Sequence, residues 1–156
     1  MYDFVLEMNK NLEKARRFCA LQERSHQELR DKLYDWGFHK EEVEEIIATM
    51  ITENFLNEER FAMAYAGGKF RIKRWGKIKI EHGLRIHRIC EPLIRQAIQS
   101  IEEDDYLECL RYILKKKEKD FNSLPTPIKK KRLLAFAYSK GFERQLVMEI
   151  WANERP

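Results

Sequence analysis

The residues best suited to a chemical role are eight lysines and arginines near the middle of the chain. They are Lys69, Arg71, Lys73, Arg74, Lys77, Lys79, Arg85 and Arg88, and Glu81 is the one acidic residue among them. Fixed positive charges at this density pair with phosphate groups or with acidic protein surfaces. We therefore expect this stretch to bind a polyanion, either DNA or an acidic protein face.

The spacing of these cations also matters. Lys69, Lys73 and Lys77 recur every four residues, so on a continuous helix they would form one ridge. Trp75 follows within the same stretch, where a ring can stack on an exposed base, although we expect it rather to cap a small core. A secondary basic surface is predicted from a second group, which comprises Lys115, Lys116, Lys117, Lys129, Lys130, Lys131 and Arg132.

Other kinds of chemistry find little support. His82 and His87 are five residues apart, which places them on different faces of a helix, so they do not form a metal-ligand pair. Residues 67–69 read Gly-Gly-Lys but lack the spacing and the Ser or Thr of a phosphate loop. The acidic residues within 41–45 fall on a predicted exposed helix face. We expect no catalytic residue, no metal and no cofactor, and hence a protein that is not an enzyme.

Composition predicts a helical protein with segregated charge. The chain has 156 residues, of which 44% are hydrophobic and 36% charged, and its net charge is +4. Residues 41–60 hold seven acids and one base, in contrast to the basic stretch that follows. Six glycines and four prolines leave little room for a fold with many tight turns. Such polarity suits a molecule with one basic face.

Three cysteines, Cys19, Cys90 and Cys109, are widely spaced and form no Cys-x-x-Cys pair. Free thiols in a reducing compartment explain this pattern, so we expect a cytoplasmic protein. The first residues do not have the form of a secretory signal, and the apolar runs are far shorter than a membrane span. We therefore expect no membrane partner, and a monomer.

One pattern occurs three times along the chain. A short turn separates two helical patterns at residues 33–38, 84–89 and 138–142, and an apolar helix follows each turn. Leu84 follows Leu33 by 51 residues, and Gly141 follows Gly37 by 104. A period of about fifty residues is typical of tandem repeats that stack into an extended binding surface.

We therefore predict an all-α fold, built as an elongated and curved tandem array of three three-helix repeats. The predicted units are an N-terminal extension at 1–10, then repeats at 11–55, 56–101 and 102–156. The first helix is expected to begin at Asn11. Ser25 and Glu28 have the spacing of a capping box, and Asn57 is expected to cap the first helix of the second repeat.

Three local features are predicted with them. Gly67-Gly68 should weaken or bend the helix that contains it. Residues 122–127, with two prolines, should form an exposed and stiff connector. Ile128 is expected among the apolar residues of the helix that follows, together with Leu133, Phe136 and Ala137.

These residues together resemble the RecX family, the bacterial regulators of RecA recombinase. The resemblance is carried by Arg24-Ser25, Glu28-Leu29, Lys32-Leu33, Gly37, the segment Phe55-Leu56-Asn57-Glu58-Glu59-Arg60-Phe61-Ala62, Tyr65, Gly76 and Leu84. It covers about Leu12 to Trp151. The family typically has a glycine in the turn where this chain has His87-Arg88, and a more arginine-rich second unit.

The resemblance implies a curved chain of three-helix repeats that lies in the groove of the RecA–DNA filament. It implies a regulator, mainly an inhibitor, of ATP hydrolysis, strand exchange and filament extension in homologous recombination, DNA repair and the SOS response. Single- or double-stranded DNA is a further expected partner. The alternative is a direct DNA-binding module of helix-turn-helix type, acting as a transcriptional or architectural factor. A plain helical scaffold is a third hypothesis.

Overall fold

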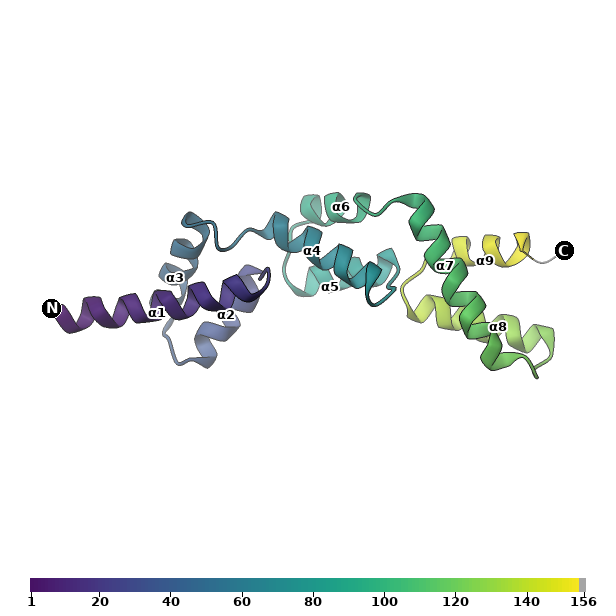
Figure 1. The fold of residues 1–156 in the computed structure, drawn as a ribbon, viewed down its shortest axis with the longest axis horizontal. Coiled ribbons are helices and arrows are strands. Elements are labelled where there is room, and N and C mark those ends of the chain that lie inside the picture. The colour runs from purple at the N-terminus through teal and green to yellow at the C-terminus, as the bar shows by residue number, and fades with distance from the viewer. Residues whose placement is uncertain (155–156) are drawn as a thin grey trace.

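The computed structural model describes residues 1–154, which form nine α-helices and one short 3-10 helix with no strand among them. The helices are α1 (Tyr2–Leu21), α2 (His26–Asp35), α3 (Lys40–Thr52), α4 (Glu58–Arg71), α5 (Lys77–Ile86), α6 (Glu91–Gln99), α7 (Glu103–Glu118), η1 (Lys119–Phe121), α8 (Thr126–Ser139) and α9 (Arg144–Asn153). Figure 1 shows three clusters in a row, with the two chain ends at opposite ends of the molecule. We call α1–α3 repeat 1, α4–α6 repeat 2 and α7–α9 repeat 3. The predicted elongated array of three-helix repeats is confirmed.

Local caps fix where the helices begin. The Ser25 hydroxyl accepts a hydrogen bond from the Glu28 N–H at 3.0 Å, and the Glu28 carboxylate accepts from the Ser25 N–H at 2.9 Å. Asn57 Oδ1 accepts from the Arg60 N–H at 2.9 Å, at the start of α4. Both caps satisfy N–H groups that have no partner inside the helix, and both were predicted from the sequence.

Helix α1 is longer than predicted, since it begins at Tyr2 rather than Asn11. Residues 2–10 continue the helix beyond the rest of repeat 1, and all of them are exposed. The core of repeat 1 starts only at Ala15, which is fully buried together with Leu29, Leu33 and Val43.

Helix α4 runs through Gly67-Gly68 without a break, so the expectation that these glycines interrupt the helix is wrong. The carbonyl of Gly68 accepts from the Ile72 N–H at 2.9 Å, as in a regular helix. Gly67 is buried, on the same face as Ala62, Ala66 and Phe70. Packing of this face against α6 outweighs the modest cost of about 1 kcal/mol for each glycine in a helix.

The turn between the second and third helix has the same backbone form in every repeat. Gly37, Arg88 and Gly141 occupy it with φ angles of 91°, 57° and 94°. In each case the N–H of the following residue donates to the carbonyl five positions earlier, at 3.1, 3.1 and 3.2 Å. Glycine adopts this left-handed conformation at little cost, whereas arginine is strained in it. The second repeat thus keeps the turn without the glycine that favours it.

Two predictions for repeat 3 need correction. The connector is shorter than residues 122–127, because α8 already begins at Thr126 and Pro127 lies in its first turn, where proline is tolerated. Ile128 is 45% exposed and is not part of the core. It lies five positions before Leu133, which is about 140° around the helix, so Leu133 and Ala137 are buried and Ile128 is not. Phe136 is partly buried against the core.

The two junctions between repeats follow one scheme. In each, the first residue of the second helix pairs with the first residue of the next repeat: His26 Nδ1 lies 3.2 Å from Glu58, and Lys77 Nζ lies 3.2 Å from Glu103. The cap of that second helix then meets the turn after the next repeat's second helix. Equivalent residues therefore make the contacts at both junctions between successive repeats.

The junctions differ in strength. Ser25 and His87 share a side-chain hydrogen bond of 3.5 Å at the first. At the second, the Gly76 N–H donates to the Lys140 carbonyl at 2.7 Å, and the Ile78 N–H donates to the Gly141 carbonyl at 3.0 Å. One continuous apolar cluster joins repeats 2 and 3, while repeat 1 has a separate core.

Candidate polyanion-binding surface

The structure divides the eight central cations into two groups. Four lie against aromatic rings and are partly buried, namely Lys69, Arg74, Lys77 and Lys79. The other four are exposed, namely Arg71, Lys73, Arg85 and Arg88. The exposed group is more accessible to a large ligand than the ring-contacting group, although Arg85 is also ion-paired with Glu91. Arg74 of the first group lies over the Tyr112 ring, which is itself 45% exposed.

The expected ridge of Lys69, Lys73 and Lys77 does not continue. Helix α4 ends at Arg71, and the chain turns through Arg74, whose φ is +55°, before α5 starts at Lys77. Lys77 is then drawn to repeat 3: its side chain is 19% exposed and pairs with Glu103. The expected ridge is therefore wrong, because α4 ends at Arg71, before Lys73 and Lys77.

Trp75 has the core-edge position that was expected for it. Its ring is half-buried and packs against the core of repeats 2 and 3. The ammonium groups of Lys69 and Lys79 lie 4.8 and 4.6 Å from the ring centroid. Contacts of this length give a cation–π attraction of about 0.5–1 kcal/mol at exposed sites. These two lysines therefore help to hold the α4–α5 turn.

The second junction brings a further cation to the surface that sequence reasoning missed. Lys140 Nζ donates to the Lys73 carbonyl at 3.2 Å, and Lys79 Nζ donates to the Ser139 carbonyl at 3.5 Å. These contacts join residues that are 67 and 60 positions apart in the sequence. Lys140 lies within the third copy of the repeated turn, directly before Gly141, and that position was the available signal.

Arg85 and Arg88 stand apart from the α4 cations. Arg85 pairs with Glu91 at 2.8 Å and with Glu81 at 3.6 Å. The hydrogen bond from Arg85 lowers the pKa of the Glu91 carboxyl below its usual value. Arg88 is exposed, in the left-handed turn before α6. Arg85 is thus partly neutralised, whereas Arg88 keeps its charge available.

Tyr112 links the two predicted basic surfaces. Its ring, 45% exposed on α7, has the Arg74 guanidinium 4.1 Å from its centroid and the Lys116 ammonium at 5.9 Å. Arg74 belongs to repeat 2 and Lys116 to repeat 3. One basic surface therefore runs across the second junction, where the sequence indicated two separate groups.

The remaining cations of the secondary surface have mixed roles. Lys117 lies 5.2 Å from the Phe136 ring, and Arg132 lies 5.7 Å from the Phe121 ring. Lys129 is only 17% exposed and lies 3.8 Å from Glu118. Lys115, Lys130 and Lys131 are exposed and have no such contact within residues 1–154.

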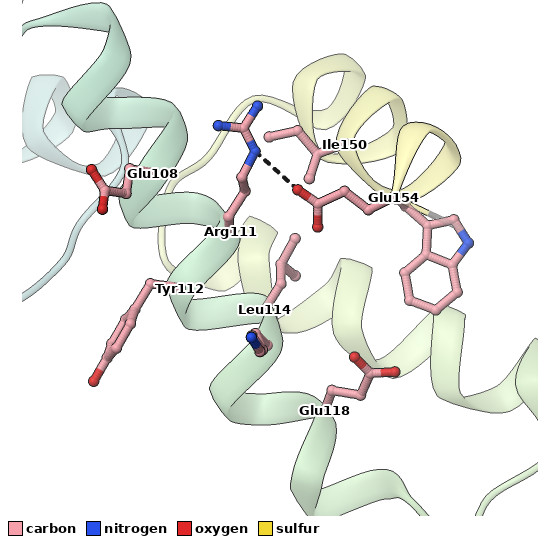
Figure 2. A pocket seen from close by; sticks show the side chains of 9 residues that line it. Glu108, Arg111, Tyr112, Leu114, Glu118, Ile150 and Glu154 are labelled. Atoms are coloured by element: carbon pink, nitrogen blue, oxygen red, sulfur yellow. Dashed lines mark ion pairs between the residues drawn. The ribbon is translucent and has the colours of Figure 1, made fainter. Parts of the chain in front are cut away.

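A groove of about 750 Å³ lies beside this surface, between α7 and α9. Figure 2 shows Arg111 of α7 reaching across it to Glu154, at an N–O distance of 2.9 Å. Its other lining groups include Glu108, Glu118 and Lys115, so both signs of charge are present. Within residues 1–154 no group of His, Cys, Asp and Glu is arranged to hold a metal.

Comparison with known proteins identifies the relatives of this chain. Residues 12–50 match the family model of the first three-helix domain of RecX, and residues 57–98 match that of the second. The Regulatory protein RecX of Thermotoga maritima is 32% identical over 146 residues, which is 93% of this chain and 84% of that protein. The Regulatory protein RecX of Prosthecochloris aestuarii is 27% identical over 143 residues, 92% of each chain.

The fold has a solved counterpart. The crystal structure of RecX from Lactobacillus salivarius matches with a TM-score of 0.83 and covers 96% of this chain and 97% of that one. The two sequences are 19% identical, so this likeness concerns the fold. None of the helices within residues 1–154 has the length and apolar character that crossing a membrane requires.

Proposed function

Because this chain belongs to the RecX family, we propose that it regulates RecA recombinase, mainly as an inhibitor, by binding along the groove of the RecA–DNA filament. In this role it lowers ATP hydrolysis, strand exchange and filament extension during recombination and repair. We propose that it acts in the cytoplasm, as a monomer, and without catalysis of its own. Units at 1–10, 11–55, 56–101 and 102–156 are proposed as its domains.

The observation that carries this proposal is the basic surface across the second junction. Arg71 is the last residue of α4 and Lys73 follows it. Arg74 and Lys116 lie beside the Tyr112 ring. These five residues belong to repeats 2 and 3. Repeats 2 and 3 share one core, so these charges are held at fixed spacing. A rigid row of cations suits a polymer whose charges also repeat.

The elongated shape supports the same proposal. A filament groove is long, and an extended array can contact neighbouring subunits at once. Several weak contacts made together raise the overall affinity without any single strong site.

The test measures ATP turnover by RecA filaments on single-stranded DNA as the protein is added. ATP turnover should fall as the unaltered protein is added. The Arg71→Ala/Lys73→Ala/Lys116→Ala variant should bind the filament about tenfold more weakly, a loss of about 1.4 kcal/mol in binding free energy. The salt dependence of binding should fall with it if phosphates are contacted.

A matched control removes three exposed cations from repeat 1, in Lys10→Ala/Arg17→Ala/Lys40→Ala. Its net charge equals that of the test variant, so a general charge effect would weaken both equally. Unchanged ATP turnover at saturating protein would refute the regulatory role. Equal weakening in both variants would refute the assignment of the surface.

The alternative, a helix-turn-helix module that reads duplex DNA, has weaker support. In repeat 1 the third helix would enter the major groove, yet α3 presents Glu41, Glu42 and Glu45 as exposed acids. Phosphates on both sides of the groove would repel them. Tight and sequence-dependent binding to naked duplex DNA would favour this alternative.

A further inference from the structure

Repeat 1 contains a groove that the proposed function does not use. It has a volume of about 560 Å³ and lies between the first turns of α1, the α2–α3 turn and α3. Its apolar lining comes from Phe4, Met8, Leu12, Trp36, Phe38 and Ile46. Phe4, Met8 and Leu12 are four residues apart, so they follow one face of α1.

The N-terminal part of α1 leaves much of this apolar surface uncovered. Phe4 is 68% exposed and Met8 37%, and the neighbouring Val5 and Leu6, which do not line the groove, are 53% and 55% exposed. A helical segment without tertiary packing is marginal in water, because most helix stability in proteins comes from burial of its apolar face. A contiguous exposed patch of this kind marks a contact site for another molecule.

The charge around the groove indicates what that molecule is. Glu7, Glu42 and Glu45 line it. Glu42 caps α3, since its carboxylate accepts from the His39 N–H at 2.9 Å, while Glu7 and Glu45 are exposed and make no ion pair within residues 1–154. Lys14 is the one cation among the lining residues, and its ammonium lies over the Trp36 ring at 4.1 Å.

We propose that this groove binds a short amphipathic helix of a partner protein, whose apolar face enters the groove while flanking lysines or arginines meet Glu7 and Glu45. The apolar floor supplies the affinity, and the acidic rim selects a basic helix over an acidic one. The site lies on repeat 1, apart from the basic surface of repeats 2 and 3. It therefore stands independently of the filament proposal.

The test uses the full chain with Trp75→Phe and Trp151→Phe, which leaves Trp36 in the groove as the fluorescent reporter. The probe is a synthetic helical peptide with leucines at i, i+3, i+4 and i+7 and lysines beside them. The matched peptide carries glutamates in place of the lysines. The lysine peptide should change Trp36 emission saturably and bind at least about tenfold more tightly than the glutamate peptide.

Two variants locate the contact. Glu7→Lys/Glu45→Lys should weaken the lysine peptide about tenfold and strengthen the glutamate peptide, whereas Glu102→Lys/Glu108→Lys, with the same net charge on repeat 3, should change neither. Met8→Glu, at an exposed position that leaves the core intact, should abolish binding of both peptides.

No saturable response, or equal affinity for the two peptides, would overturn the proposal. Sedimentation of the chain without peptide measures its oligomeric state and so tests whether a second copy fills the groove. A dimer that Met8→Glu dissociates would assign the groove to a second copy of this chain and overturn the partner helix. Neither measurement involves a recombinase or DNA. A negative result would therefore overturn the groove proposal without bearing on the proposed function.

Discussion

Tyr106 and Lys77 contact each other twice across the junction of repeats 2 and 3. The main-chain N–H of Lys77 donates to the Tyr106 hydroxyl at 3.0 Å, and the Lys77 ammonium lies 4.4 Å from the centroid of the same ring. The hydroxyl in turn donates to the Glu143 carboxylate at 2.6 Å. Burial, and then the bond to Glu143, raises the pKa of Tyr106, so the hydroxyl stays protonated as a donor. One side chain thus joins α5, α7 and the start of α9.

Replacing Tyr106 with Phe should lower the free energy of unfolding by about 1–3 kcal/mol, because the Lys77 N–H and the Glu143 carboxylate both lose a partner. Urea denaturation followed by circular dichroism measures the change. Tyr112→Phe is the matched control, since that ring is 45% exposed and its hydroxyl makes no hydrogen bond within residues 1–154. Its effect should stay within about 0.5 kcal/mol. Equal losses in the two variants would contradict a role for the Tyr106 hydroxyl.

Gly141→Ala should destabilise the protein far more than Gly37→Ala. Both glycines have positive φ, 94° and 91°, so each substitution costs about 1–2 kcal/mol in backbone strain. A Cβ at Gly141 would also meet the Cβ and backbone of Lys79, whereas a Cβ at Gly37 would meet nothing within 4 Å. Overpacking adds about 1–3 kcal/mol. Thermal or urea unfolding of the two variants compares them directly, and similar losses would mean that repeats 2 and 3 do not approach each other so closely.

Arg88→Gly should stabilise the fold by up to about 1 kcal/mol, because the arginine holds a left-handed φ of 57° that glycine adopts without strain. The same change removes one exposed cation of the candidate surface. Stability and filament binding should therefore move in opposite directions, and unfolding and binding assays on one sample would show this. A loss of stability would indicate that the Arg88 side chain makes contacts that outweigh the strain.

Thiol labelling should distinguish the three cysteines. Burial raises the pKa of Cys19 to about 11 and also raises that of Cys109, whereas Cys90 is exposed at the start of α6. At pH 8 only about one Cys19 side chain in a thousand is then a thiolate, the reactive form. Ellman's reagent at that pH should react quickly with one thiol and reach the other two only on unfolding. A Cys90→Ser variant should lose the fast phase, and a fast phase that persists would contradict the assignment.

Much of the fold follows from short-range patterns in the sequence. The capping box at Ser25, the cap at Asn57 and the repeated turn each depend on residues within a few positions, so they could be predicted and are confirmed. The stripe of Leu29 and Leu33 was likewise visible as a helical period. Regular caps and periods determine where helices start and which face is buried.

The features that sequence reasoning missed depend on distant partners. The helix through Gly67-Gly68 persists because α6 packs on it, and the cations at Lys77 and Lys79 are drawn inward by Glu103 and the α8–α9 turn. No local pattern specifies such contacts. Whether a lysine faces solvent or covers a ring depends on which residues of another repeat lie beside it. The sequence therefore predicted where along the chain the candidate surface lies, but not which of its cations are exposed.

The unequal junctions have a mechanical consequence. Repeats 2 and 3 form a stiff segment, because backbone hydrogen bonds and one core hold them together. Repeat 1 has a separate core and is attached through the Ser25–His87 contact and the two pairs His26–Glu58 and Glu23–Arg60. Bending the molecule therefore costs least at the joint between α3 and α4. If a helical partner has a pitch that does not match the curvature of this molecule, the molecule would bend at that joint. Repeats 2 and 3 would then rotate together as one rigid body relative to repeat 1.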